Sequence, residues 1–192
     1  MISKEMLFGY QAVFEIMNVN IFQFIEAKKD DFLWERGFRP AFTEEKYTKY
    51  DEKSYIILSP TGEFTVVIEP QSQTDASKKL KDAHSLIQEI ADFVAQGVEF
   101  EIREDIKHIL VFYQTLDLRT LLPKWYISAV DPSRTELQEF KTFIEDRDGD
   151  KVRLTEVVLR TREKNILEIR IISPDLDLAK QLVKSISASA TE

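Results

Sequence analysis

Histidine and carboxylate side chains are the groups in this chain that could carry acid–base chemistry. The sequence holds two histidines, His84 and His108, and no cysteine. His84 follows Ala83 in a segment with helical spacing, and His108 precedes an apolar run. A general base needs a partner within hydrogen-bond reach that holds it in place, and the neighbouring sequence supplies none. We therefore interpret both histidines as structural residues.

An acidic cluster is the nearest approach to a metal-binding motif. Its members are Glu145, Asp146, Asp148 and Asp150. An EF-hand loop needs glycine at its sixth position and glutamate at its twelfth, whereas Gly149 is fourth from Asp146 and Val157 is twelfth. Phosphate-binding glycine loops, zinc-ligand spacing and Gly-x-Ser-x-Gly are also absent. The sequence thus predicts no catalytic residue, no metal site, no cofactor and a protein that is not an enzyme.

Aromatic residues in polar segments are the best candidates for a binding surface. Residues 40–53 are polar and aromatic without a clear period, so we expect a loop there, and a second such segment precedes Trp125. Tyrosine and tryptophan on loops often anchor binding surfaces, although they also fold back over the edge of a core. The predicted binding residues are Phe42, Tyr47, Tyr50, Trp125 and Tyr126.

The most basic stretch of the chain lies within residues 152–173. A hairpin that turns at Lys164 and Asn165 would place Arg160 and Arg162 on one face near its tip. These two arginines and Lys164 are candidate contacts for an anion or an RNA phosphate. Glutamates interleave with them, so ordinary cross-strand charge pairing is the alternative interpretation.

Composition narrows the class of protein further. The chain of 192 residues carries a formal net charge of −8, and this acidity is spread along both halves. Nucleic-acid binding rests on a basic footprint, which is missing, so we expect no direct binding of nucleic acid. No apolar run is long enough for a membrane span, and the first residues do not resemble a signal peptide. Together with the absence of cysteine, this predicts a cytoplasmic protein.

Period-two alternation predicts most of the strands. Residues 6–17 alternate between two faces, and residues 55–58 and 64–68 flank a Ser-Pro-Thr-Gly turn that predicts a β-hairpin. The remaining predicted strands are a second hairpin over 98–103 and 109–113, a strand at 124–130 and the third hairpin at 152–173.

Apolar residues at helical spacing predict the helices. The clearest is 75–96, with an apolar stripe that includes Ile87 and Ile90 and a stop at Gly97. A second helix is expected from Asn20 to Gly37, and a last one begins at Pro174. One more is expected to begin at Ser133 and to bury Leu137, Phe140, Phe143 and Ile144.

Hairpins followed by helices predict an α+β fold with a mostly antiparallel sheet and helices packed on one face. We expect one compact domain over residues 1–192, with pseudo-repeated halves at 1–103 and 104–192. The first half has the β-α-β-β-α-β order of a ferredoxin-like unit, and the second resembles an incomplete copy. The alternative is a single long sheet that wraps one helix and encloses a cavity.

These features predict a non-catalytic, intracellular protein that binds another macromolecule, as an inhibitor, an immunity-type factor or an assembly factor. The acidic surface suits another protein of basic character as the partner, and homo-oligomerisation stays open. The alternative function is a small-molecule-binding domain with a cavity between the sheet and the helix at 75–96. A third function is a metal-assisted hydrolase that uses scattered carboxylates.

Overall fold

The chain folds into two compact units. A computed structural model of the protein describes residues 5–21, 31–41, 47–115, 139–148, 151–163 and 166–189. One unit is Gly9–Ile106, which we call the α3 unit, and the other is Met1–Phe8 with Lys107–Glu192, which we call the α5 unit. Four of the predicted binding residues lie outside the described residues, as does the predicted strand at 124–130. These residues are Phe42, Trp125, Tyr126 and Lys164.

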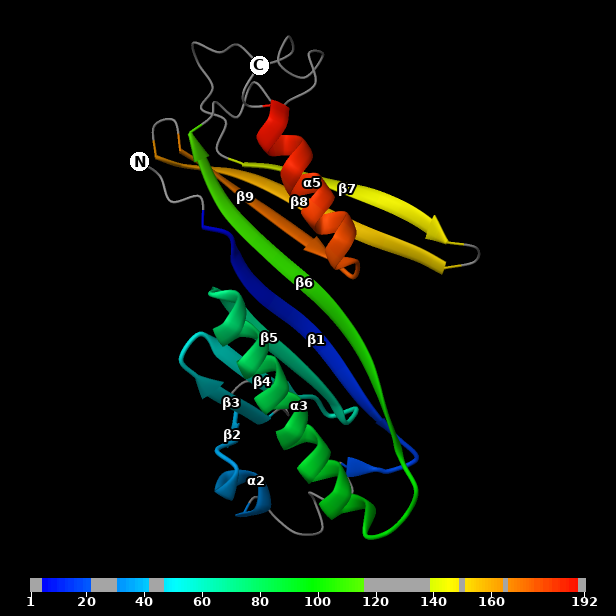
Figure 1. Ribbon diagram of the computed structural model, residues 1–192. Helices are drawn as coiled ribbons and strands as arrows, with labels where there is room; N and C mark the ends of the chain where they lie inside the picture. The colour runs from blue at the N-terminus through cyan, green and yellow to red at the C-terminus, as the bar shows by residue number, and fades with distance from the viewer. Residues whose placement is uncertain are drawn as a thin grey trace. The chain divides into compact units, whose positions relative to one another are not determined.

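Strands dominate both units (Figure 1). The α3 unit contains most of β1 (Leu7–Met17), α2 (Asp31–Glu35), β2 (Arg39–Pro40), β3 (Tyr47–Asp51), β4 (Ser54–Leu58), β5 (Glu63–Gln71), α3 (Gln73–Ala95) and the start of β6 (Glu101–Thr115). The α5 unit contains the rest of β6, β7 (Glu139–Asp148), β8 (Lys151–Glu163), β9 (Ile166–Ser173) and α5 (Leu176–Ser189). Among the described strands, the hydrogen-bonded order is β2-β3-β4-β5-β1-β6-β9-β8-β7.

The α+β class and the mostly antiparallel sheet are confirmed. Antiparallel registers join β2–β3, β3–β4, β4–β5, β6–β9, β8–β9 and β7–β8. The ferredoxin-like pseudo-repeat and the single compact domain stay predictions. Within the described residues, no helix combines the length and the apolar character that a membrane crossing requires.

Helix α3 follows directly from its sequence. Ser72 caps its start, because the Ser72 hydroxyl accepts a hydrogen bond of 3.2 Å from the Asp75 amide. Its buried stripe includes Ala83, Ile87 and Ile90, and the left-handed Gln96 and Gly97 end it. The helix predicted at 75–96 is therefore confirmed.

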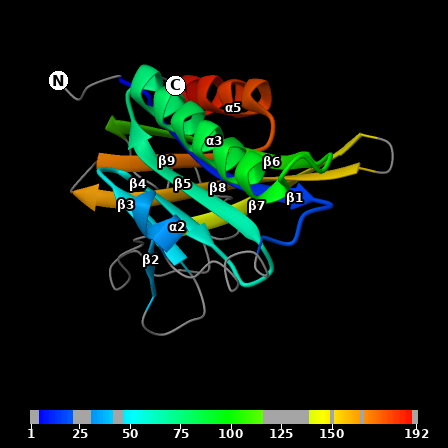
Figure 2. The same cartoon turned by 90° about the horizontal axis from the view of Figure 1, so that it is seen from below.

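The core of the α3 unit forms where α3 covers one face of β4 and β5, as Figure 2 shows. Cross-strand pairs Ile56–Val66 and Leu58–Phe64 share this face, and all four side chains are buried. The predicted hairpin and its turn are confirmed, although β5 continues through Pro70 to Gln71. Strand β1 confirms the strand predicted at 6–17.

Gly9 in β1 marks a close approach of two backbones. A Cβ atom at this position would lie 2.5 Å from the Ile68 carbonyl oxygen and 3.1 Å from the Pro70 nitrogen. Real Cβ atoms do not approach backbone so closely, so only glycine fits.

The core of the α5 unit forms where α5 covers one face of the strands. Leu110, Leu167, Ile169 and Ile171 from β6 and β9 pack in one cluster with Ala179 of α5. Asp175 caps the helix, since its Oδ1 accepts from the amides of Asp177 (2.9 Å) and Leu178 (3.0 Å). The third hairpin and the last helix are thus confirmed in their described parts.

Three predicted elements are wrong. The segment 40–53 is not all loop, because Tyr47–Asp51 forms β3 and turns into β4 through Glu52 and Lys53. The hairpin predicted over 98–103 and 109–113 is wrong, because Glu101–Thr115 forms one continuous strand, β6. The helix predicted from Ser133 is also wrong in its described part, because Phe140, Phe143 and Ile144 lie in strand β7, paired along its length with β8.

Candidate ligand pocket

A pocket of about 750 Å³ lies within the α3 unit. Residues of β3, β4 and β5 form one side, and residues of α3 form the other. Its size falls in the range of small-molecule sites. The α3 residues that line it run from Asp75 to Leu86, in the first part of the helix.

Four of the buried residues that line the pocket are apolar. Ile56 of β4, Val66 and Ile68 of β5, and Ala83 of α3 line it, and each of these side chains is at most 7% exposed. This part of the pocket can hold an apolar group.

The rim of the pocket carries both signs of charge in equal number. Its four lysines are Lys49, Lys53, Lys78 and Lys79, and its four acids are Asp51, Glu52, Asp75 and Asp82. Each such lysine is formally +1 and each acid −1, so the rim is formally neutral. A rim of this kind suits a ligand that itself carries both charges.

Some of these charges are already engaged. Lys79 pairs with Asp51, and this hydrogen bond, with others, holds the pKa of the Asp51 carboxyl below its usual value. Lys49 donates to the Arg36 carbonyl oxygen at 2.9 Å. Lys78 and Asp82, in contrast, have no ion-pair partner among the described residues. They are therefore available to a ligand.

Gln71 gives the pocket an unsatisfied donor. This residue ends β5, lines the pocket and is 8% exposed. Its Nε2 is buried and has no acceptor within the described part of the chain. Leaving such a group unpaired costs roughly 1–3 kcal/mol. A carbonyl or carboxylate oxygen of a ligand would satisfy it.

The two described tyrosines among the predicted binding residues lie on opposite faces of β3. Tyr47 shares its face with Lys49 and is opposite Leu58, whereas Tyr50 is opposite Tyr55. Tyr50 is 75% exposed, and its ring centroid is 6.0 Å from that of Tyr55. Both Tyr50 and Tyr55 border the pocket. Nothing in the sequence marked Gln71 or Lys78 as site residues.

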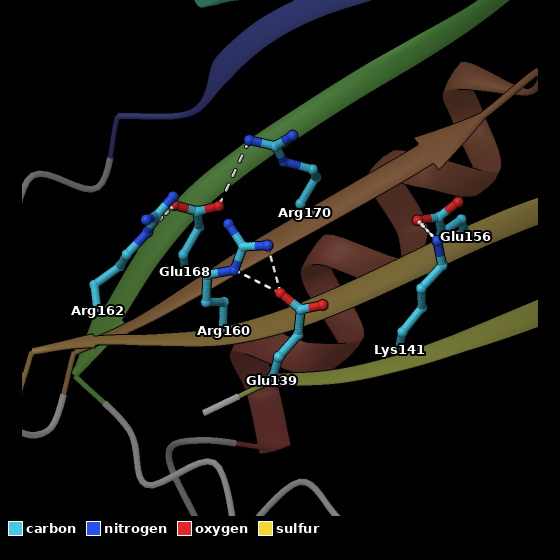
Figure 3. A network of polar contacts seen from close by, with 7 residues as sticks. All are labelled: Glu139, Lys141, Glu156, Arg160, Arg162, Glu168 and Arg170. Atoms are coloured by element: carbon cyan, nitrogen blue, oxygen red, sulfur yellow. Dashed lines mark hydrogen bonds and ion pairs between the residues drawn. The ribbon is translucent and has the colours of Figure 1, made fainter. Parts of the chain in front are cut away.

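The basic stretch on β8 forms a network with acidic residues, shown in Figure 3. The Arg160 Nε donates to Glu139 of β7 at 2.6 Å, and the Arg162 Nε donates to Glu168 of β9 at 2.6 Å. Lys141 pairs with Glu156 in the same way at 2.6 Å. Both candidate anion contacts that the structure describes are thus engaged in cross-strand ion pairs.

Glu168 is the buried centre of this network. Its side chain is 3% exposed, and Arg170 approaches its second oxygen at 3.6 Å. The Tyr113 hydroxyl also donates to it, at 3.4 Å. The carboxylate raises the pKa of the Arg162 guanidinium above its ordinary value. Its burial and these partners give Glu168 a structural role in joining β6, β8 and β9.

The two histidines lie apart from the pocket lining. The His84 Nε2 is 3.4 Å from Glu104, and its ring meets Phe14 edge-on at 5.7 Å. Burial lowers the pKa of His108, Lys180 adds to this and Asp175 opposes it. Among the described residues, no group of three or more histidine, cysteine or acidic side chains could hold a metal ion.

No protein-family model matches the sequence, and no curated protein matches it either.

Proposed function

We propose that the α3 unit binds a small ligand that carries an anionic group, a cationic group and an apolar body. The observation that carries this proposal is the buried Gln71 amide at the pocket wall, whose Nε2 lacks an acceptor among the described residues. A ligand oxygen supplies that acceptor. This proposal takes up the small-molecule site between the sheet and the helix at 75–96, the alternative function considered from the sequence, and adds a charged rim to it.

The ligand class follows from the pocket lining. The apolar residues Ile56, Val66 and Ala83 receive the body of the ligand. The ammonium of Lys78 attracts its anionic group, and the carboxylate of Asp82 attracts its cationic group. Unblocked apolar dipeptides have this chemistry and a suitable size.

The proposal is tested by titrating the protein with leucyl-phenylalanine in a calorimeter. Two blocked forms serve as controls, one acetylated at the amine and one amidated at the carboxyl group. We expect the free dipeptide to bind and each blocked form to bind about tenfold more weakly, since each loses one charge-assisted contact. Absence of binding at millimolar concentration, or equal binding of all three forms, contradicts the proposal.

Paired variants locate the site. Gln71→Leu removes the buried amide, and Gln88→Leu makes the same change on α3 outside the pocket lining. Lys78→Ala and Lys81→Ala form a second pair of this kind. We expect only Gln71→Leu and Lys78→Ala to weaken binding of the dipeptide. Equal effects within either pair place the site elsewhere.

A macromolecular partner, the function first expected from the sequence, is the second candidate. Its support is a cluster of exposed apolar side chains on the β7–β8 hairpin of the α5 unit. Phe143 is 58% exposed, Val152 56% and Leu154 53%. Exposed apolar clusters with a polar surround are typical of interaction sites.

A further inference from the structure

Among the strands that the structure describes, β7 lies at the edge of the sheet in the α5 unit. In the hydrogen-bonded order of the described strands, β7 is terminal and pairs only with β8, as Figure 1 shows. An edge strand presents backbone donors and acceptors to which another extended chain can add. Phe143 lies at the centre of this strand and is 58% exposed.

One face of β7 carries charges in an ordered pattern. Alternate residues of a strand point to one face, and the set that includes Phe143 is Glu139, Lys141, Phe143, Glu145 and Arg147. At equal distances from Phe143 along the strand, the residues on its two sides carry charges of opposite sign. Lys141 is matched by Glu145, and Glu139 by Arg147. A strand with this pattern is complementary to its own reversed copy.

We propose that two copies of this chain associate through β7, antiparallel and centred on Phe143. In this register Phe143 lies opposite Phe143 of the second copy, Lys141 opposite its Glu145, and Glu139 opposite its Arg147. Each charge pair occurs twice because of the two-fold symmetry. Oppositely charged residues that face each other across antiparallel strands stabilise the pairing.

The charge pattern also disfavours the neighbouring registers. If the second copy of β7 is shifted by two residues along the first in one direction, Glu139 lies opposite Glu145 of the second copy. The same shift in the other direction places Lys141 opposite Arg147. Both bring like charges together. Because these shifts keep the same face of the strand, the charges rather than the face select the register.

Apolar side chains on β8 extend the contact. Leu154 lies opposite Glu145 and is therefore the diagonal neighbour of Phe143, and Val152 lies opposite Arg147 on the same face. Both are more than half exposed. Around the two-fold axis, Phe143 and Leu154 of each copy come together and bury apolar surface.

The charges of β7 have partners within the chain but stay accessible. Glu139 pairs with Arg160, Lys141 with Glu156, and Glu145 with Arg147. Of the four side chains that would cross the interface, the least exposed is Glu139, at 42%. Association extends these pairs into networks and breaks none of the strand pairing described above. This inference is independent of the ligand pocket, which lies in the α3 unit.

The test is sedimentation equilibrium of the full chain and of two charge-reversed variants. Lys141→Glu places glutamates opposite each other at two positions, and Glu145→Lys does the same with lysines. We expect the unaltered chain to form dimers and each variant to raise the dissociation constant by at least about tenfold. An equimolar mixture of the two variants should form a heterodimer with nearly the original affinity, because opposite charges face each other again.

A control variant tests whether the effect on association is specific to β7. Lys184→Glu reverses an exposed lysine of α5, away from β7, and should leave association unchanged. Thermal unfolding of each variant monitors its fold, and the rescue by mixing shows that both variants are folded. An unaltered chain that stays monomeric at millimolar concentration overturns the proposal and leaves the surface to a different partner. Dimers that both variants preserve, or a mixture that fails to recover, also overturn it.

Discussion

At the scale of single residues, Glu168 shows how burial changes the contribution of an ion pair to stability. Its carboxylate is 3% exposed and receives hydrogen bonds from Arg162 and Tyr113. The pair between Arg160 and Glu139 has similar geometry, but each of its side chains is 42% exposed. Exposed pairs contribute little to stability, whereas a buried charge that loses a partner is costly.

We therefore expect Arg162→Met and Arg160→Met to differ. Arg162→Met should lower the free energy of unfolding by roughly 1–3 kcal/mol, since it removes a donor from a buried carboxylate. Arg160→Met should lower it by less than about 1 kcal/mol. Urea denaturation of both variants measures the difference. Equal losses would mean that Glu168 does not depend on Arg162.

His108 makes stability depend on pH. Burial and Lys180 lower its pKa in the folded state from the ordinary value of 6.5, and the opposing Asp175, itself paired with Arg153, does not restore it. As pH falls below 6.5, the unfolded chain binds a proton at this residue before the folded chain does. The contribution of neutral His108 to the free energy of unfolding is therefore fully present above this pH and is lost as the pH falls below it.

His108→Gln is expected to flatten this dependence. The free energy of unfolding, measured in urea from pH 7 to pH 5, should fall less steeply in the variant than in the unaltered chain. An unchanged slope would show that His108 contributes no difference in proton binding between the two states.

At the scale of elements, the sequence predicted those with strong local signals. Helix α3 has a serine cap, an apolar stripe and a glycine stop, and α5 follows Pro174 with an aspartate cap. The β4–β5 hairpin has Pro60 and Gly62 in its turn. In each case the local chemistry and the tertiary structure favour the same conformation.

Elements were missed where local signals were weak or conflicted with tertiary pairing. The spacing of Phe140, Phe143 and Ile144 matches a helix, but alternation in β7 also sends Phe140 and Ile144 to the core and Phe143 to the surface. Because β7 pairs with β8 along its length, the segment forms a strand rather than a helix. The turn between β3 and β4 has left-handed Lys53 and no glycine, so nothing marked it as a hairpin.

Strand β6 had a signal that could have been used. Between Gly97 and Pro123 the sequence has no glycine, proline or asparagine, three of the residues that turns favour. Asp105 is the one turn-favouring residue in the predicted turn, and it does not interrupt the strand. The pocket could not be predicted in the same way. Gln71 and Lys78 line it together only because α3 packs on the sheet.

The cap of α3 offers a test at this scale. Ser72→Ala removes the acceptor of the Asp75 amide and should lower the free energy of unfolding by about 1 kcal/mol. Ser85→Ala, on the exposed face of the same helix, should change it by less than about 0.5 kcal/mol. Thermal denaturation of the two variants gives the comparison. A Ser72→Ala variant as stable as Ser85→Ala would show that the cap does not stabilise the helix.

At the scale of the whole molecule, the two proposed binding activities belong to different units. The ligand pocket is built within the α3 unit, and the β7 edge belongs to the α5 unit. No residue is shared between the pocket lining and the proposed dimer contact. Each activity can therefore be removed by substitution without a direct change in the other.

Crossed measurements test this separation. Lys78→Ala should weaken dipeptide binding and leave the dissociation constant of the dimer unchanged. Lys141→Glu should weaken the dimer and leave dipeptide binding by the monomer unchanged. Calorimetry gives the dissociation constant of the dipeptide for each variant, and sedimentation gives the dissociation constant of the dimer. A loss of both activities in either variant would mean that the two sites are coupled.

Ligand binding in the α3 unit is the central claim, and mapping it on the protein is the most direct measurement. Backbone amide shifts of the isotope-labelled chain are recorded while leucyl-phenylalanine is added. We predict saturable shifts concentrated in residues 49–56, in Gln71 and along α3 from Asp75 to Leu86, with the Gln71 side-chain amide among the largest. Shifts that are absent, or that concentrate away from this pocket, would contradict the claim.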